Sequence, residues 1–176
     1  MVSVDGLGGT ARVLLTGMSG SGKSTVVAAL AGRGFDAIDL DDPEWSEEVA
    51  VPGEELTGIG GGRDWVWREE RVRRLLDRPA DGPLFVSGCS PNQGLFYPHL
   101  DRIILLTAPV DVIVSRLETR TTNTFGKRPD EVKRVLRLKE EIEPRLRGGA
   151  TLEIDTSVPL DWVIGQVLRH VGVAAG

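Results

Sequence analysis

Residues 17–25 read Gly17-Met18-Ser19-Gly20-Ser21-Gly22-Lys23-Ser24-Thr25, which matches the pattern G-x-x-x-x-G-K-[ST]. This pattern is typical of a loop that wraps around the phosphate groups of ATP or GTP. The apolar run 13–15 before it predicts a buried strand, and residues 25–30 after it predict the first turns of a helix. Between a strand and a helix, the main-chain N–H groups of such a loop point at phosphate oxygens. We therefore predict a phosphate-binding loop, in preference to a glycine-rich turn before an ordinary helix.

The residue types inside the loop suit different parts of a magnesium–nucleotide complex. Its glycines let the backbone close around phosphates without Cβ clashes. Lys23 supplies a mobile cation for the β- and γ-phosphates, and Ser24 offers a hydroxyl to Mg²⁺. The cofactors that we expect are therefore ATP and Mg²⁺. The residues that we expect to bind the nucleotide are Gly17, Ser19, Gly20, Ser21, Gly22, Lys23, Ser24 and Thr25.

Strands and helices are predicted to alternate along the rest of the chain. The predicted strands are 13–15, 35–40, 84–87, 102–107 and 151–155, and the predicted helices after the first are 64–77, 111–120, one from Pro129 that Pro144 ends or kinks, and 159–171. Alternation of this kind indicates right-handed crossovers and a parallel sheet that is covered on both faces. We predict an α/β fold of three layers, α/β/α, with a five-stranded parallel sheet, in a single domain over 1–176.

The composition is that of an ordinary globular chain, with 40% hydrophobic and 27% charged residues. The net charge of −5 argues against a nucleic-acid partner. A single cysteine, Cys89, gives neither an intramolecular disulfide nor metal-ligand spacing. The sequence shows no membrane-spanning run and no signal peptide at its start. We expect a cytoplasmic protein, monomeric or homodimeric, without a membrane partner.

Acidic residues end the second predicted strand, where the sequence reads Asp39-Leu40-Asp41-Asp42. In an open parallel sheet, ligands bind at the carboxyl ends of the strands. Asp39 and Asp41 alternate along an extended chain, so their carboxylates point to the same side and repel each other. A hydrated Mg²⁺ would relieve that repulsion, while one carboxylate could accept a proton from a substrate hydroxyl. The alternative is a solvated acidic turn in which Asp42 caps a short helix.

Taken in order, these elements resemble the small-molecule kinases of the shikimate kinase and gluconate kinase type, within the nucleoside monophosphate kinase-like group. The resemblance covers nearly the whole chain and is specific in three places. They are the phosphate-binding loop near the N-terminus, the Asp39-x-Asp41 pair and the stretch Ser115-Arg116-Leu117-Glu118-Thr119-Arg120. In those kinases the last stretch leads from a helix into a lid.

The resemblance also implies roles for individual residues. Asp39 would serve a hydrated Mg²⁺, Asp41 would contact the substrate hydroxyl, and Arg116 and Arg120 would fold over the ATP phosphates. The lid would span about residues 117–130. Its charge favours the same interpretation, because phosphoryl transfer depends mostly on positioning and on cations. The alternative is an exposed basic helix followed by a surface loop.

The substrate side of the predicted site is less similar to that family. Trp67-Arg68 resembles the Phe-Arg of shikimate kinases, in which the arginine holds a carboxylate, so we expect Arg68 to bind an anionic or polar group. Asn92 lies after the third predicted strand, and its amide suits a hydroxyl or a base edge. Three tryptophans and the cysteine would either pack in the core or line this pocket: Trp45, Trp65, Trp67 and Cys89.

From these residues we predict an ATP-dependent phosphotransferase that acts on a hydroxyl of a small molecule. Its catalytic residues would be Lys23, Asp41, Arg116 and Arg120. Two alternatives stay open. A nucleoside monophosphate kinase would use the basic stretch 63–78 to hold the phosphate of its acceptor, and a non-catalytic nucleotide-binding regulator would use the lid to signal to a partner.

Overall fold

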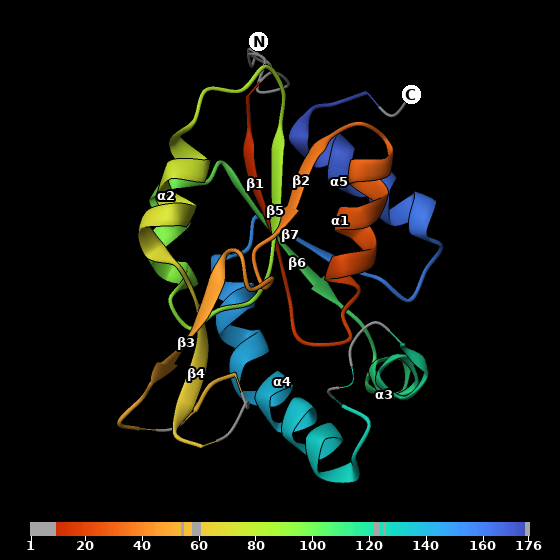
Figure 1. Cartoon of the computed structure of the whole chain (residues 1–176). Coiled ribbons are helices and arrows are strands. Elements are labelled where there is room, and N and C mark those ends of the chain that lie inside the picture. Colours follow the sequence, from red (N-terminus) through yellow and green to blue (C-terminus); the bar gives the residue numbers. More distant parts are fainter. Residues whose placement is uncertain (1–9, 54, 58–60, 122–123, 125, 175–176) are drawn as a thin grey trace.

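Five parallel strands form the central sheet, in the order β2-β5-β1-β6-β7 (Figure 1). A computed structural model describes residues 10–53, 55–57, 61–121, 124 and 126–174 of the chain. The strands of the sheet are β1 (Arg12–Thr16), β2 (Asp36–Asp39), β5 (Leu84–Ser87), β6 (Arg102–Thr107) and β7 (Leu152–Asp155). The five-stranded parallel sheet predicted from the sequence is therefore confirmed.

Helices cover both faces of the sheet and complete the three predicted layers. One face is covered by α1 (Lys23–Gly32) and α5 (Leu160–Val171), and the other by α2 (Glu69–Asp77), the short 3-10 helix η1 (Gln93–His99) and α4 (Pro129–Gly149). Figure 1 shows α1 and α5 on the side of the sheet opposite to α2. Within the described residues, each helix is too short or too polar to traverse a lipid bilayer.

The alternation of side chains along β1 explains why helices must cover both faces of the sheet. Val13 and Leu15 pack against α1 and α5, whereas Leu14 packs on the opposite face with Val86 and Ile103. Leu14 is in register with both Val86 of β5 and Ile103 of β6, so the three side chains share one face. All are nearly inaccessible to solvent, which is expected for the central strands of a parallel sheet.

A β-hairpin replaces the first part of a predicted helix. The sequence predicted a helix over 64–77, but the chain forms β4 (Arg63–Trp67), which pairs antiparallel with β3 (Ser46–Ala50), and helix α2 begins only at Glu69. The prediction was wrong because the aromatic and β-branched residues 65–67 favour a strand once a partner strand is available. That partner lies in an acidic segment whose sequence has no clear strand pattern.

Two smaller alternatives that the sequence left open are not observed. Helix α4 continues through Pro144 to Gly149, so this proline does not end it. Asp42 does not cap a helix at Pro43, because its carbonyl instead accepts hydrogen bonds from the N–H groups of Trp45 and Ser46 in a turn. The third helix, α3 (Val110–Thr119), agrees with its prediction within one residue at each end.

Asp64 holds the hairpin to the segment that precedes β4. Its carboxylate is buried and accepts hydrogen bonds from the N–H groups of Leu56 and Thr57 and from the Thr57 hydroxyl, at 2.8 to 2.9 Å. Asp64 therefore fixes the connection within the hairpin rather than capping a helix.

We expect Asp64→Ala to lower the free energy of unfolding by about 1–3 kcal/mol, because it removes the buried acceptor of three part-buried hydrogen bonds. Urea denaturation followed by circular dichroism measures this change. Glu48→Ala is the matched control, since Glu48 is a half-exposed hairpin acid that pairs with Arg63, and it should cost less than about 1 kcal/mol. Equal losses in the two variants would show that Asp64 has no special role in the hairpin.

Candidate active site

The predicted phosphate-binding loop joins β1 to α1, at the carboxyl edge of the sheet. Gly20 and Gly22 adopt left-handed backbone conformations, with φ of 83° and 95°, which residues with a side chain rarely adopt. The Lys23 ammonium donates hydrogen bonds to the carbonyls of Gly17, at 2.6 Å, and Met18, at 3.2 Å. The lysine is thus folded back over its own loop.

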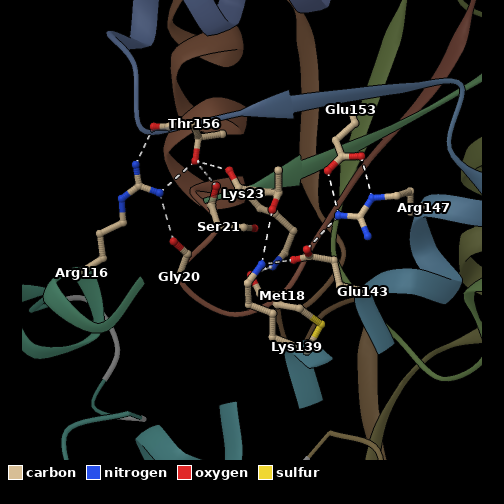
Figure 2. Close-up of polar contacts among 11 residues, drawn as sticks. Met18, Gly20, Ser21, Lys23, Arg116, Lys139, Glu143, Arg147, Glu153 and Thr156 are labelled. Carbon is tan, nitrogen blue, oxygen red and sulfur yellow. Dashed lines mark hydrogen bonds and ion pairs between the residues drawn. The ribbon is translucent and has the colours of Figure 1, made fainter. Parts of the chain in front are cut away.

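Arg116 of α3 contacts this loop directly (Figure 2). Its guanidinium donates to the Gly20 carbonyl at 3.1 Å, to the Thr156 hydroxyl at 2.9 Å and to the Thr156 carbonyl at 2.6 Å. Thr156 is buried, and its hydroxyl lies 2.7 Å from the carbonyl of Ser21. No role for the Thr156 side chain could be predicted from the sequence, because Thr156 lies 135 residues from Ser21 and no local pattern joins them.

Arg120 lies on the same side of the loop as Arg116. Its guanidinium is 3.4 Å from the Ser19 hydroxyl. Burial lowers the pKa of both arginines from its ordinary value, because it removes water from a charged group. A phosphate group beside them would compensate for that lost hydration. The structure thus brings both predicted lid arginines to the phosphate-binding loop.

The segment between α3 and α4 is fixed at the α4 end by Glu131. Its carboxylate accepts hydrogen bonds from the N–H groups of Gly126, Lys127 and Arg128, at 2.9 to 3.1 Å. The Lys127 ammonium in turn donates to the carbonyls of Glu118 and Arg120, and so links the two helices. Thr122, Asn123 and Phe125 of the predicted lid lie outside the described residues.

Helix α4 is joined to the same edge of the sheet by buried charges. Lys139 pairs with Glu143, and its ammonium lies 3.4 Å from the Thr107 hydroxyl at the end of β6. Arg147 joins Glu143, at 3.0 Å, to Glu153 of β7, at 2.7 Å. Figure 2 shows these side chains in a row beside the phosphate-binding loop. Lys139, Glu143 and Arg147 follow one another at intervals of four residues, which places side chains on one face of a helix. The sequence could therefore have predicted that they pair.

The two residues predicted to serve Mg²⁺ lie together. The Ser24 hydroxyl donates to Asp39 Oδ2 at 3.2 Å, and Asp39 Oδ1 accepts the N–H of Asp41 at 3.1 Å. A hydroxyl and a carboxylate are the oxygen ligands that suit a Mg²⁺ that keeps several waters. The described residues contain no cluster of three or more His, Cys, Asp or Glu for a fully protein-bound ion. The pair therefore fits a hydrated Mg²⁺ that also binds phosphate oxygens.

Asp41 lies deeper than Asp39 and is held by several donors. Its Oδ1 accepts the indole N–H of Trp67 at 3.1 Å, and both carboxylate oxygens lie 3.2 to 3.3 Å from the N–H of Cys89. Burial raises the pKa of Asp41 to about 6, against the opposing effects of the Lys23 charge and the Trp67 hydrogen bond. Burial likewise raises the pKa of the Cys89 thiol, so this thiol is uncharged at neutral pH. A carboxylate with a raised pKa is a better proton acceptor than an exposed aspartate.

The predicted acceptor-side residues are engaged within the protein. Arg68 pairs with Glu47 of β3 at 3.0 Å, on the surface of the hairpin. The Asn92 amide accepts the main-chain N–H of Trp67 at 3.2 Å and donates to the Trp67 carbonyl at 2.9 Å. The Arg71 guanidinium lies 5.0 Å from the centre of the Trp45 ring, and Trp45 packs against the core cluster that contains Trp67. The sequence analysis assigned no partner to Trp67, whose indole N–H reaches Asp41.

Small-molecule kinases are among the solved structures that superpose with this chain. Shikimate kinase from Bacteroides thetaiotaomicron superposes with a TM-score of 0.63 at 18% identity, covering 93% of this chain and 99% of that one. Shikimate kinase from Acinetobacter baumannii in complex with shikimate gives 0.58 at 16% identity, covering 92% and 94%. Deoxyadenosine kinase from M. mycoides with bound dATP gives 0.57 at 12% identity, covering 92% and 99%. The chain has the P-loop kinase fold.

The family follows from the sequence profile that the chain matches. Residues 13–139 match the AAA domain profile AAA_18, and the chain belongs to this family. A curated "Nucleotide-binding protein" of Thermosipho africanus (strain TCF52B) is 26% identical over 146 residues. That match covers 82% of this chain and 48% of the relative, so the chain spans about half the length of that protein.

The contact between Thr156 and the loop yields a test of nucleotide binding. Thr156→Val keeps the shape of the side chain but removes the hydroxyl that Arg116 and Ser21 share. We expect it to weaken binding of a non-hydrolysable Mg-ATP analogue about fivefold, the effect of one hydrogen bond, as measured by isothermal titration calorimetry. Thr156→Ser keeps the hydroxyl and should bind like the unmodified protein. If the valine variant binds equally well, Thr156 does not shape the nucleotide site.

Proposed function

We propose that this protein is an ATP-dependent phosphotransferase that moves the γ-phosphate of Mg-ATP to a hydroxyl of a small molecule. One observation carries the proposal. The Asp41 N–H donates to Asp39 Oδ1 at 3.1 Å, and Asp39 Oδ2 accepts the hydroxyl of Ser24, the neighbour of Lys23 in the phosphate-binding loop, at 3.2 Å, so the Asp41 carboxylate lies beside the loop that carries the Lys23 charge. A phosphate-directed cation and a proton acceptor are the two groups that transfer to a hydroxyl needs side by side.

The proposed reaction assigns one role to each group. The loop N–H groups and Lys23 hold the β- and γ-phosphates, while Ser24 and Asp39 hold hydrated Mg²⁺, which when bound neutralises phosphate charge. Asp41 accepts the proton of the acceptor hydroxyl as the hydroxyl oxygen attacks the γ-phosphorus. The bond from that phosphorus to the β–γ bridging oxygen breaks, and ADP leaves with that oxygen.

The arginines supply the remaining positive charge in this proposal. Arg116 and Arg120 already contact the loop at Gly20 and Ser19, so small movements would bring their guanidiniums onto phosphate oxygens. Residues 117–130, which include Arg120 and directly follow Arg116, would act as the lid that excludes water. Arg68 would exchange its exposed partner Glu47 for an anionic group of the acceptor, since exposed ion pairs are weak.

The reaction is tested by ADP release with four probe acceptors: shikimate, D-gluconate, deoxyadenosine and AMP. We expect Lys23→Ala to lower turnover of the best acceptor about 100- to 1,000-fold, because one preorganised charge contact is lost. Asp41→Asn should lower kcat at least about 100-fold with little change in the KM for ATP, since Asp41 faces the acceptor.

Asp42→Asn is the matched control, because Asp42 is an exposed neighbour with no role in the proposed reaction. It should retain the kcat of the unmodified protein. Equal kcat values for the Asp41 and Asp42 variants would remove the proposed proton acceptor. Full turnover by a folded Lys23→Ala variant would overturn the ATP-dependent mechanism itself.

A further inference from the structure

The two tryptophans of β4 both bond to Asp41. Trp67 donates its indole N–H to the Asp41 carboxylate at 3.1 Å, and Trp65 donates its indole N–H to the Asp41 carbonyl at 2.9 Å. The two residues alternate along one strand, so their side chains leave the hairpin on the same side. The hairpin thus holds both the main chain and the side chain of Asp41, at the edge of the main sheet.

Trp67 is held in place both at its ring and at its main chain. Its side chain is 2% exposed and packs against the Phe96 ring, with centroids 5.6 Å apart. Its main-chain N–H and carbonyl are both bonded to the Asn92 amide, at 3.2 and 2.9 Å. A donor that is held at its ring and at its backbone has little freedom to follow a moving carboxylate.

Gly88 allows the carboxylate and the indole to meet. A Cβ at this position would lie 2.6 Å from Asp41 Oδ1 and 2.9 Å from Trp67 Cζ2, closer than atoms can approach. The backbone at Gly88, with φ of 150°, is also one that residues with a side chain rarely adopt. The lack of a side chain at Gly88 therefore leaves room for the contact between Asp41 and Trp67.

We infer that Trp67 is a positioning residue for the phosphotransfer, which orients the Asp41 carboxylate toward the acceptor. The indole N–H occupies Oδ1, and Oδ2, to which the described part of the chain donates only the shared N–H of Cys89, is turned to the acceptor hydroxyl. Asn92 supports this arrangement by holding the backbone of Trp67. The inference rests on the proposed function, and it adds a specific hydrogen bond that the reaction requires.

The kinetic test removes the N–H and keeps an aromatic ring. Trp67→Phe should lower kcat with the best of the four probe acceptors about tenfold, while the KM for ATP stays within twofold, because a charge-assisted hydrogen bond that orients Asp41 is lost. Trp162→Phe is the matched control, since Trp162 is an exposed tryptophan of α5, and it should keep the unmodified kcat. An unchanged kcat in Trp67→Phe, or a loss that appears in the KM for ATP, overturns the inference.

A spectroscopic test covers the case in which Trp67→Phe does not fold. In ¹H–¹⁵N spectra, the indole signal of Trp67 should move upfield in Asp41→Asn, because the acceptor loses its charge, while the signals of Trp45 and Trp162 stay in place. A Trp67 signal that does not move shows that the hydrogen bond is absent and overturns the inference. Failure of the proposed function is distinct, because the unmodified protein would then phosphorylate a hydroxyl of none of the probes, and the positioning role would fall with it.

Discussion

The pairing of β1 between β5 and β6 is the constraint on which the site depends. Because all five strands of the central sheet are parallel, this pairing brings their carboxyl ends to one edge of the sheet. The phosphate-binding loop leaves β1 there, and Asp39 at the end of β2 is in register with Ser87 of β5. Main-chain hydrogen bonds between strands thus bring Lys23, which follows β1, near Asp39 and Asp41 at the end of β2, two strands away in the sheet.

Two further parts of the chain make that edge rigid. The hairpin of β3 and β4 reaches over it through Trp65 and Trp67, which bond to Asp41. Helix α4 contacts β6 through the Lys139 ammonium, which lies 3.4 Å from the Thr107 hydroxyl, and β7 through the ion pair of Arg147 with Glu153 at 2.7 Å.

Much of this architecture could be predicted from the sequence, because the strands of a buried parallel sheet are short apolar runs and the glycine loop has a fixed pattern. The hairpin could not, because residues 65–67 form a strand only with a distant partner at 46–48. For the same reason, Asn92 was predicted from the sequence to bind the substrate. In the structure its amide is hydrogen-bonded to the backbone of Trp67. Thr156 and Trp67 act through contacts across more than 25 residues, which leave no local pattern.

The central claim is that the γ-phosphate of ATP passes to a carbon-bound hydroxyl at Asp41. Phosphorus NMR of the reaction mixture tests this most directly, because it shows the chemical form in which the transferred phosphate ends. The account predicts a new phosphomonoester signal that grows together with ADP when an acceptor is present. Growth of ADP with inorganic phosphate alone, or with a new phosphoanhydride on a nucleotide acceptor, would contradict it.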